Sequence, residues 1–359
     1  AVEVLSYAME LSQEIGSSFA MLSAFWHLSS LQTAQLLLQA AENTCRHLEH
    51  AAHMPGLQRF PTSGYVTLLL GEISLERNDL DAADRYLLES AEQMNPESFP
   101  LALLRAYIAL ARLKTLQGDS DGAGHYWQLA EQLERMSKLQ GRATLLSISR
   151  VHRWLEQGKL YAVEGWAAEN HLGVDDEFSY HHEAYYLMLA RLYIARGNQI
   201  DKALYLLERM VNRAEVNQRN GSLIRALVLQ AVAFHAGDDS QKAVEALVRA
   251  LSLAEQEQPL RVFADEGHPI ALLLEKTLDM QRKGRLVLPI SSEYAARLLI
   301  AMGQPSLAPA PPRRSVGHLA DVLSSRELEV LRLLADGLDS NEIAERLVIA
   351  VDTARKHIK

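Results

Sequence analysis

The stretch Leu75-Glu76-Arg77-Asn78-Asp79-Leu80-Asp81-Ala82-Ala83 decides the fold, because the turn at its centre recurs along the chain. Asparagine, aspartate and glycine are the residues that most readily end one helix and begin the next. Matching turn signals follow at intervals of 40, 40, 39 and 40 residues: Asn78-Asp79, Gly118-Asp119, Gly158-Lys159, Gly197-Asn198 and Gly237-Asp238. A fixed period of this length indicates an internal repeat with one supersecondary unit per period.

Each predicted unit is a pair of helices joined by the turn. In three units the first helix carries a small residue seven positions before the turn: Gly71, Ala111 and Ala190. The second helix has a small residue five or six positions after the turn: Ala83, Ala123, Ala203 and Ala243. A large apolar residue follows four positions later: Leu87, Trp127, Leu207 and Leu247. We therefore expect the four alanines to be buried where the paired helices cross.

This grammar resembles a tetratricopeptide-like repeat, lengthened to about 40 residues, over residues 17–258. The resemblance implies an all-α solenoid of stacked helix pairs with a concave groove. Before the first full unit, we expect one helix that ends at Gly16 and two more over residues 19–29 and 31–53. The expected domains are the repeat (1–258), a helical capping segment with helices over 270–280 and 292–302 (259–303), a proline-rich linker (304–322) and a terminal helical unit (323–359).

The terminal unit has the signals of three short helices. Ser324 with Glu327, and Asp339 with Glu342, have the spacing of two capping boxes that open the first two helices. The third helix carries Arg355, Lys356 and Lys359 on one face. Two short helices, a tight turn and a basic helix are typical of a helix-turn-helix DNA-binding unit. On spacing alone, a small three-helix cap with a solvated basic end is the alternative.

Residues 323–331, 337–344 and 353–359 resemble the LuxR-type helix-turn-helix. The resemblance implies a bacterial transcription regulator in which Arg355, Lys356 and Lys359 face the major groove of double-stranded promoter DNA. It also implies that Thr353 touches phosphate, and that Ser340 and Asn341 contact the DNA backbone. A homodimer is the oligomeric state that goes with this role.

Three features depart from the LuxR-type pattern. Ala350 stands where the family usually has a serine that caps the recognition helix, and Ala354 stands where valine is usual. The sequence also stops at Lys359, within the recognition helix, so we expect the terminal unit to be C-terminally incomplete. These departures leave a competing hypothesis: a repeat scaffold that binds proteins, with a degenerate terminal domain that does not bind DNA.

The phrases Val-Phe-Ala-Asp-Glu-Gly (262–267) and Tyr-Ala-Ala-Arg-Leu-Leu (294–299) resemble the segment before the reader in large ATP-binding, MalT-like regulators of the LuxR family. That resemblance implies a nucleotide-binding domain ahead of the repeat. Gly158-Lys159-Leu160 lacks the remaining residues of a phosphate-binding loop. We therefore expect no cofactor in these residues, ATP only through an absent N-terminal domain, and a chain cut at both ends.

Composition limits the remaining classes of function. The chain has 359 residues, 48% hydrophobic but only 6% aromatic, which favours packed helices. A net charge of −9 confines any DNA binding to a local basic surface. Cys45 is the only cysteine, and there is no long apolar run, so we expect a cytoplasmic protein without a membrane partner. No catalytic motif is present, so an enzyme is not expected, and the helical histidines 47, 50 and 53 are more typical of a polar face than of a metal site.

The richest aromatic and histidine content of the repeat lies in two neighbouring units. The residues concerned are His152, Trp154, Tyr180, His182, Tyr185 and Tyr186. One interpretation is a groove wall that stacks on a small-molecule, peptide or protein effector. The other is ordinary packing between repeats, and the sequence does not decide between them.

Overall fold

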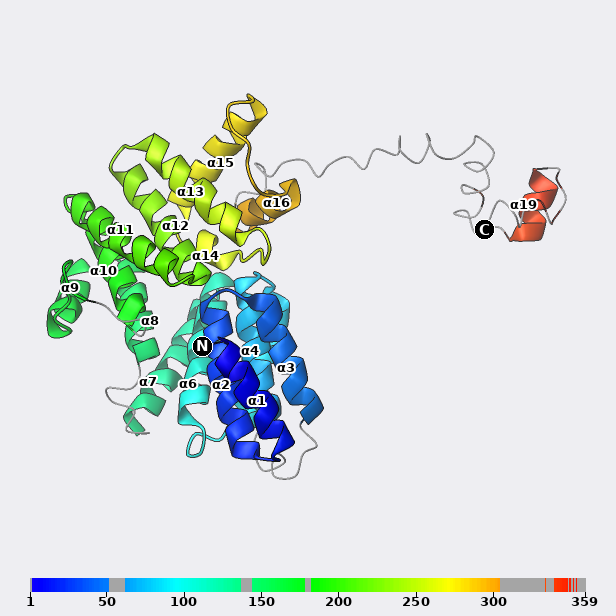
Figure 1. Cartoon of the computed structure of the whole chain (residues 1–359), viewed down its shortest axis with the longest axis horizontal. Helices are drawn as coiled ribbons and strands as arrows, with labels where there is room; N and C mark the ends of the chain where they lie inside the picture. Colours follow the sequence, from blue (N-terminus) through cyan, green and yellow to red (C-terminus); the bar gives the residue numbers. More distant parts are fainter. Residues whose placement is uncertain are drawn as a thin grey trace. The chain divides into compact units, whose positions relative to one another are not determined.

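A computed structural model describes residues 2–51, 62–136, 144–177 and 182–303, together with residues 333, 339–347, 349, 351 and 353 near the C-terminus. The chain divides into two compact units, residues 1–308 and 309–359. Every regular element in the described ranges is a helix, which confirms the predicted all-α class (Figure 1).

The described helices of the first unit follow one another with short turns. They are α1 (Val2–Glu14), α2 (Ser18–Ala34), α3 (Leu38–Ala51), α4 (Thr62–Glu76), α5 (Leu80–Gln93), α6 (Pro100–Leu116), α7 (Ser120–Met136), α8 (Thr144–Glu156), α9 (Leu160–Glu169), α10 (Glu183–Arg196), α11 (Ile200–Val216), α12 (Asn220–Ala236), α13 (Ser240–Ala254), α14 (Arg261–Ala264), α15 (His268–Arg282) and α16 (Ser292–Ala301). The second unit contains α19 (Ser340–Arg346).

The five predicted turns fall between paired helices, so the repeat is confirmed. They join α4 to α5, α6 to α7, α8 to α9, α10 to α11 and α12 to α13 (Figure 1). In each turn one residue takes a left-handed backbone conformation: Asn78, Gly118, Gly158, Gly197 and Asp238. At the first of these, the Asp79 amide donates to the Ser74 carbonyl at 2.8 Å, and the Asp79 carboxylate accepts from the Ala82 amide at 3.1 Å. One turn thus ends a helix and caps the next.

Small residues lie at the helix crossings as predicted in most units. Ala83, Ala203 and Ala243 have no exposed surface, while Ala123 is half-buried. In the irregular third unit, which lacks an alanine at this position, Val163 is fully buried in the equivalent place. The predicted close approach of paired helices is therefore confirmed at three of the four alanines.

The predicted break between residues 29 and 31 is wrong, because α2 continues to Ala34 and the turn lies at Gln35–Leu37. Ser29 is tolerated inside α2, where its hydroxyl donates to the Trp26 carbonyl at 3.2 Å. Leu36 takes the left-handed conformation (φ 57°) that a sequence reader expects of glycine or asparagine. Its side chain is 2% exposed and packs in the same core as residues of α10 to α13, so tertiary burial overrides the local preference.

After the last repeat pair, α15 and α16 occupy the positions predicted for the capping helices. The stretch before them was expected only to break the period. It reaches back to the first units instead: α14 packs against α4, and the Gln39 amide donates to the Glu257 carboxylate at 2.9 Å (Figure 1). Within the described ranges, none of the helices combines the length and apolar character needed to cross a membrane.

Candidate functional site

The N-terminus of α19 is built by the predicted capping box. The Asp339 carboxylate accepts hydrogen bonds from the amides of Asn341 (2.8 Å) and Glu342 (3.0 Å). In return the Glu342 carboxylate accepts from the Asp339 amide at 2.8 Å. The bonds from the Glu342 and Asn341 amides hold the pKa of Asp339 below its ordinary value. Two helix-terminal donors and the capping carboxylate are thereby paired reciprocally.

The buried face of α19 leaves its first turn accessible. Ile343 and Ala344 are buried, and Leu333, Leu347, Ile349 and Val351 pack against them. The Ile349 amide donates to the Ala344 carbonyl at 2.9 Å, which closes the turn after the helix. Asn341 is exposed and Ser340 half-buried at the start of the helix. Amides and polar side chains at a helix N-terminus suit an anionic group such as phosphate.

Of the predicted recognition-helix residues, only Thr353 is described. It is helical and exposed. Arg355, Lys356 and Lys359 lie outside the described residues, as do Ala350, Ala354 and the Ser324–Glu327 capping box. The assignment of DNA contacts to all six residues therefore stays a prediction.

The predicted effector residues lie on α8 and α10, which pack against each other. Trp154 is half-buried, and the His152 imidazole lies 3.2 Å from the Glu156 carboxylate. His182 is exposed at the start of α10. Tyr180 lies outside the described residues.

Two tyrosines of α10 have different surroundings. Tyr185 is half-buried and stacks on Trp166 of α9, with ring centroids 5.2 Å apart and planes 10° from parallel. Tyr186 is 5% exposed, and its hydroxyl donates to the Asp176 carboxylate at 3.1 Å. Burial, and then this hydrogen bond, raise the pKa of Tyr186 to about 12. Tyr186 therefore packs inside the repeat, while Tyr185 presents part of its ring. Trp166 is a neighbour that the sequence reasoning missed, although it stands in the same aromatic-rich unit.

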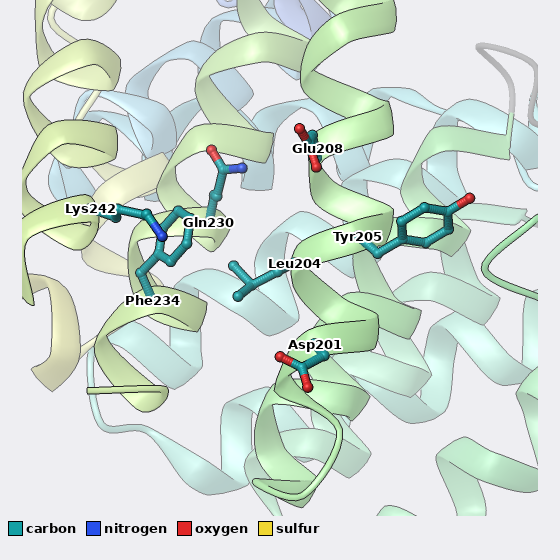
Figure 2. Close-up of a pocket in the computed structure, with 7 residues that line it drawn as sticks. All are labelled: Asp201, Leu204, Tyr205, Glu208, Gln230, Phe234 and Lys242. Carbon is teal, nitrogen blue, oxygen red and sulfur yellow. The ribbon is translucent and has the colours of Figure 1, made fainter. Parts of the chain in front are cut away.

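A surface pocket of about 490 Å³ lies elsewhere, between α11, α12 and α13. Figure 2 shows acidic residues of α11 on one side, with Phe234 of α12 and Lys242 of α13 on the other. The Lys242 ammonium is 5.5 Å from the centre of the Phe234 ring and 3.0 Å from the Asp239 carboxylate. Its lining consists of Asp201, Leu204, Tyr205, Glu208, Gln230, Phe234 and Lys242. The predicted effector residues are not among them, so this pocket is a second candidate for the effector.

The helix α3 histidines and Cys45 were weighed as a metal site. In the described part of the chain, no three histidine, cysteine, aspartate or glutamate side chains are placed to hold a metal ion. His50 Nδ1 lies 2.6 Å from the Arg46 carbonyl of its own helix. Cys45 is buried, and burial together with Glu49 and Glu42 raises the pKa of its thiol to about 12. A thiol in this environment is an unreactive core residue.

A repeat of helix pairs, followed by a separate unit with a capped helix and a small buried core, defines a two-part helical protein. Comparison with protein families is specific for both parts. Residues 1–280 match the family described as MalT-like TPR region, and residues 321–359 match the family described as bacterial regulatory proteins, luxR family. The chain therefore belongs to the MalT-like TPR region family, and the resemblance predicted from its sequence is confirmed.

Individual relatives agree with the family match. The chain is 24% identical to the HTH-type transcriptional regulator MalT of Yersinia enterocolitica, over 94% of this chain and 38% of that protein. It is 24% identical to the regulator of the same name from Vibrio campbellii, over 100% of this chain and 41% of that protein. The chain thus spans about two fifths of the length of these relatives.

Proposed function

We propose that the chain is the effector-sensing and DNA-binding part of a bacterial transcription regulator. The observation that carries the proposal is the LuxR-type match over residues 321–359, joined to a MalT-like repeat. The capping box and buried face of α19 support it, because they build the first helix of a helix-turn-helix in the expected place.

In this proposal the two ends of the helix-turn-helix have different tasks. Arg355, Lys356 and Lys359 enter the major groove, where arginine and lysine read guanine edges. Ser340, Asn341 and Thr353 contact phosphates and fix the register without reading sequence. The −9 net charge is compatible with this division, because only the terminal unit needs a basic surface.

The repeat is proposed to bind a small-molecule, peptide or protein effector on the α8–α10 surface. Trp154, His182 and Tyr185 carry the proposal because each keeps some exposure, with His152 and Tyr180 as neighbours in sequence. Candidate effectors are screened by their effect on the melting temperature. For a ligand found in this way, Trp154→Ala and Tyr185→Ala should weaken binding, while Tyr205→Ala in the pocket of Figure 2 should not. The reverse pattern would move the site to that pocket.

DNA binding is tested with a duplex selected from a random pool by the full-length gene product. Replacing Arg355 or Lys359 by alanine should cost about 1–3 kcal/mol of binding free energy if the side chain reads a base. Lys242→Ala, on the repeat, is the matched control for loss of one positive charge. The 359-residue chain should bind weakly, because its recognition helix ends at Lys359 and so short a helix depends on packing for stability. Titrations at fixed salt against a scrambled duplex measure each effect.

Specific binding that is unchanged in both substitutions would favour the second candidate, a protein-interaction scaffold. Ala350 is the observation behind that candidate, because alanine cannot supply the side-chain cap of a recognition helix.

The remaining parts of the proposal follow from the relatives, which are named as transcriptional regulators. We propose that the chain is not an enzyme, acts as a homodimer on DNA and works in the cytoplasm. ATP binding is assigned to a segment outside these 359 residues. The predicted domain boundaries, with a linker over 304–322, are part of the same proposal.

A further inference from the structure

Residues 258–267, called here the latch segment, connect α13 to α15 and contain α14. Their backbone is bonded to the end of α4, which lies more than 180 positions earlier in the sequence. The Leu260 amide donates to the Glu76 carbonyl at 2.8 Å, and the Val262 amide donates to the Glu76 carboxylate at 2.8 Å. The Arg261 guanidinium donates to the Asn78 side chain at 3.2 Å. The latch segment is therefore fixed to the first units of the repeat.

Two acidic residues of the latch segment are held by arginines from two further units. Asp265 pairs with Arg112 of α6 and with Arg261 of α14. Glu266 pairs with Arg191 of α10. The Arg261 and Glu266 side chains are only 8% and 11% exposed, so these pairs are shielded from water and from salt.

The opposite side of the latch segment is bonded to α16. The buried Tyr294 hydroxyl donates to the Pro259 carbonyl at 2.6 Å, and the Arg297 guanidinium donates to the Gln258 side chain at 3.0 Å. Helix α16 is the last helix of the first compact unit, and the chain runs from it toward the helix-turn-helix. One short segment thus contacts both the first repeat units and the helix that leads out of the repeat (Figure 1).

Opposing contributions act on the latch segment in this position. Leu260 and Phe263 are buried in the large core, which stabilises the closed position. Against this, Arg191 Nε and Nη1, Arg261 Nε and Glu255 Oε2 are buried and find no hydrogen-bond partner among the described residues. A polar network that is only partly satisfied costs free energy in a low-dielectric interior. Such a balance is what an element with two accessible positions requires.

We propose that the latch segment is a regulatory latch: closed, it ties α16 to the first units, and its release changes how the helix-turn-helix meets DNA. The proposal rests on the proposed function for the DNA-binding half. It names Asp265 and Glu266 as the residues of the latch, with Arg112 and Arg191 as their holders. An effector that separates α4, α6 or α10 from the segment would release it.

The latch itself is tested by hydrogen exchange at the Leu260 and Val262 amides of the 359-residue chain. Glu266→Arg and Arg191→Glu each place like charges together, and should speed exchange at both amides by about tenfold or more. The double variant restores an opposite-charge pair, so its exchange should return close to that of the parent, as a coupled pair requires. Asp279→Asn removes an exposed ion pair on nearby α15 and should leave exchange unchanged.

Two results would overturn the latch. One is unchanged exchange at Leu260 and Val262 in both single variants. The other is an equal increase at the buried amides of α12, which would mean that the whole repeat opens. Glu266→Gln is the milder variant if either charge reversal fails to fold, and the same two results count against the latch.

The regulatory role is tested on the full-length product, with the duplex that it selects from a random pool. Without any effector, Glu266→Gln should change the Kd for that duplex at least about fivefold, the lower end of typical allosteric coupling. Faster exchange at Leu260 with an unchanged Kd would overturn the regulatory role. If the parent selects no duplex at all, the proposed function fails, and hydrogen exchange still decides whether the segment opens.

Discussion

Asp265 is the most strongly engaged carboxylate of the latch segment, with an ion pair to Arg112 and another to Arg261. Burial acts to raise its pKa, but the two guanidinium groups outweigh burial and hold the pKa below its ordinary value of 3.8. Replacing Asp265 by asparagine leaves both arginines without their counter-charge. We expect this to lower the free energy of unfolding by about 3–5 kcal/mol, as for other broken buried pairs. Urea unfolding of the two proteins at pH 7 measures the difference.

The pH dependence of that difference has a definite sign. A carboxylate whose pKa is lowered by folding contributes stability that is fully present above its unfolded pKa and is lost as the pH falls through the folded pKa. The parent and Asp265→Asn should therefore differ by a constant amount from pH 7 to about pH 5, and should converge below the ordinary value of 3.8. A difference that grows on acidification would contradict the ion-pair assignment.

The contact between α12 and the turn after α2 depends on one glycine. A Cβ atom built at Gly221 would lie 2.4 Å from backbone atoms of Gln35, which cannot move aside as a side chain can. Gly221→Ala should therefore destabilise the repeat by about 1–3 kcal/mol through overpacking. Gly124 of α7 has no atom within 4 Å of its Cβ position, so Gly124→Ala should instead stabilise by about 0.4–1 kcal/mol. Thermal unfolding of both variants checks the sign at each position.

Helix pairs could be predicted wherever the turn uses a residue that suits the left-handed conformation. Asn78, Gly118, Gly158, Gly197 and Asp238 met that condition, and each turn was placed correctly. Leu36 takes the same conformation without a local signal, because its side chain is buried against distant helices. That turn was missed for this reason.

The candidate site shows the same limit. Asp339 and Glu342 formed the capping box that their spacing predicted, because both partners lie within one turn of helix. The packing of Tyr186 inside the repeat, and the contact of residues 258–267 with α4, depend on how successive pairs rotate. Small rotations that accumulate over several units decide such contacts, and no local pattern encodes them.

Contacts between the first and last units change how the repeat should behave as a body. In an open solenoid each unit touches only its neighbours, so stability is nearly a sum of local terms and the ends can fray separately. Here the turn after α2 contacts α12, and the end of α4 contacts the latch segment. Long-range contacts of this kind couple the early and late units into one cooperative structure.

We therefore expect residues 2–303 to unfold in a single transition. Trp26 lies among the early helices and Trp166 in the later core, so variants that keep only one of these tryptophans report on opposite ends of the repeat. Both should show the same urea midpoint, because the contacts between α4 and the latch segment make opening of either end expose the other. In Glu266→Arg, which is designed to release the latch segment, the two midpoints should separate, and the Asp279→Asn control should keep them together. Separate midpoints in the parent chain would show that the units unfold independently despite these contacts.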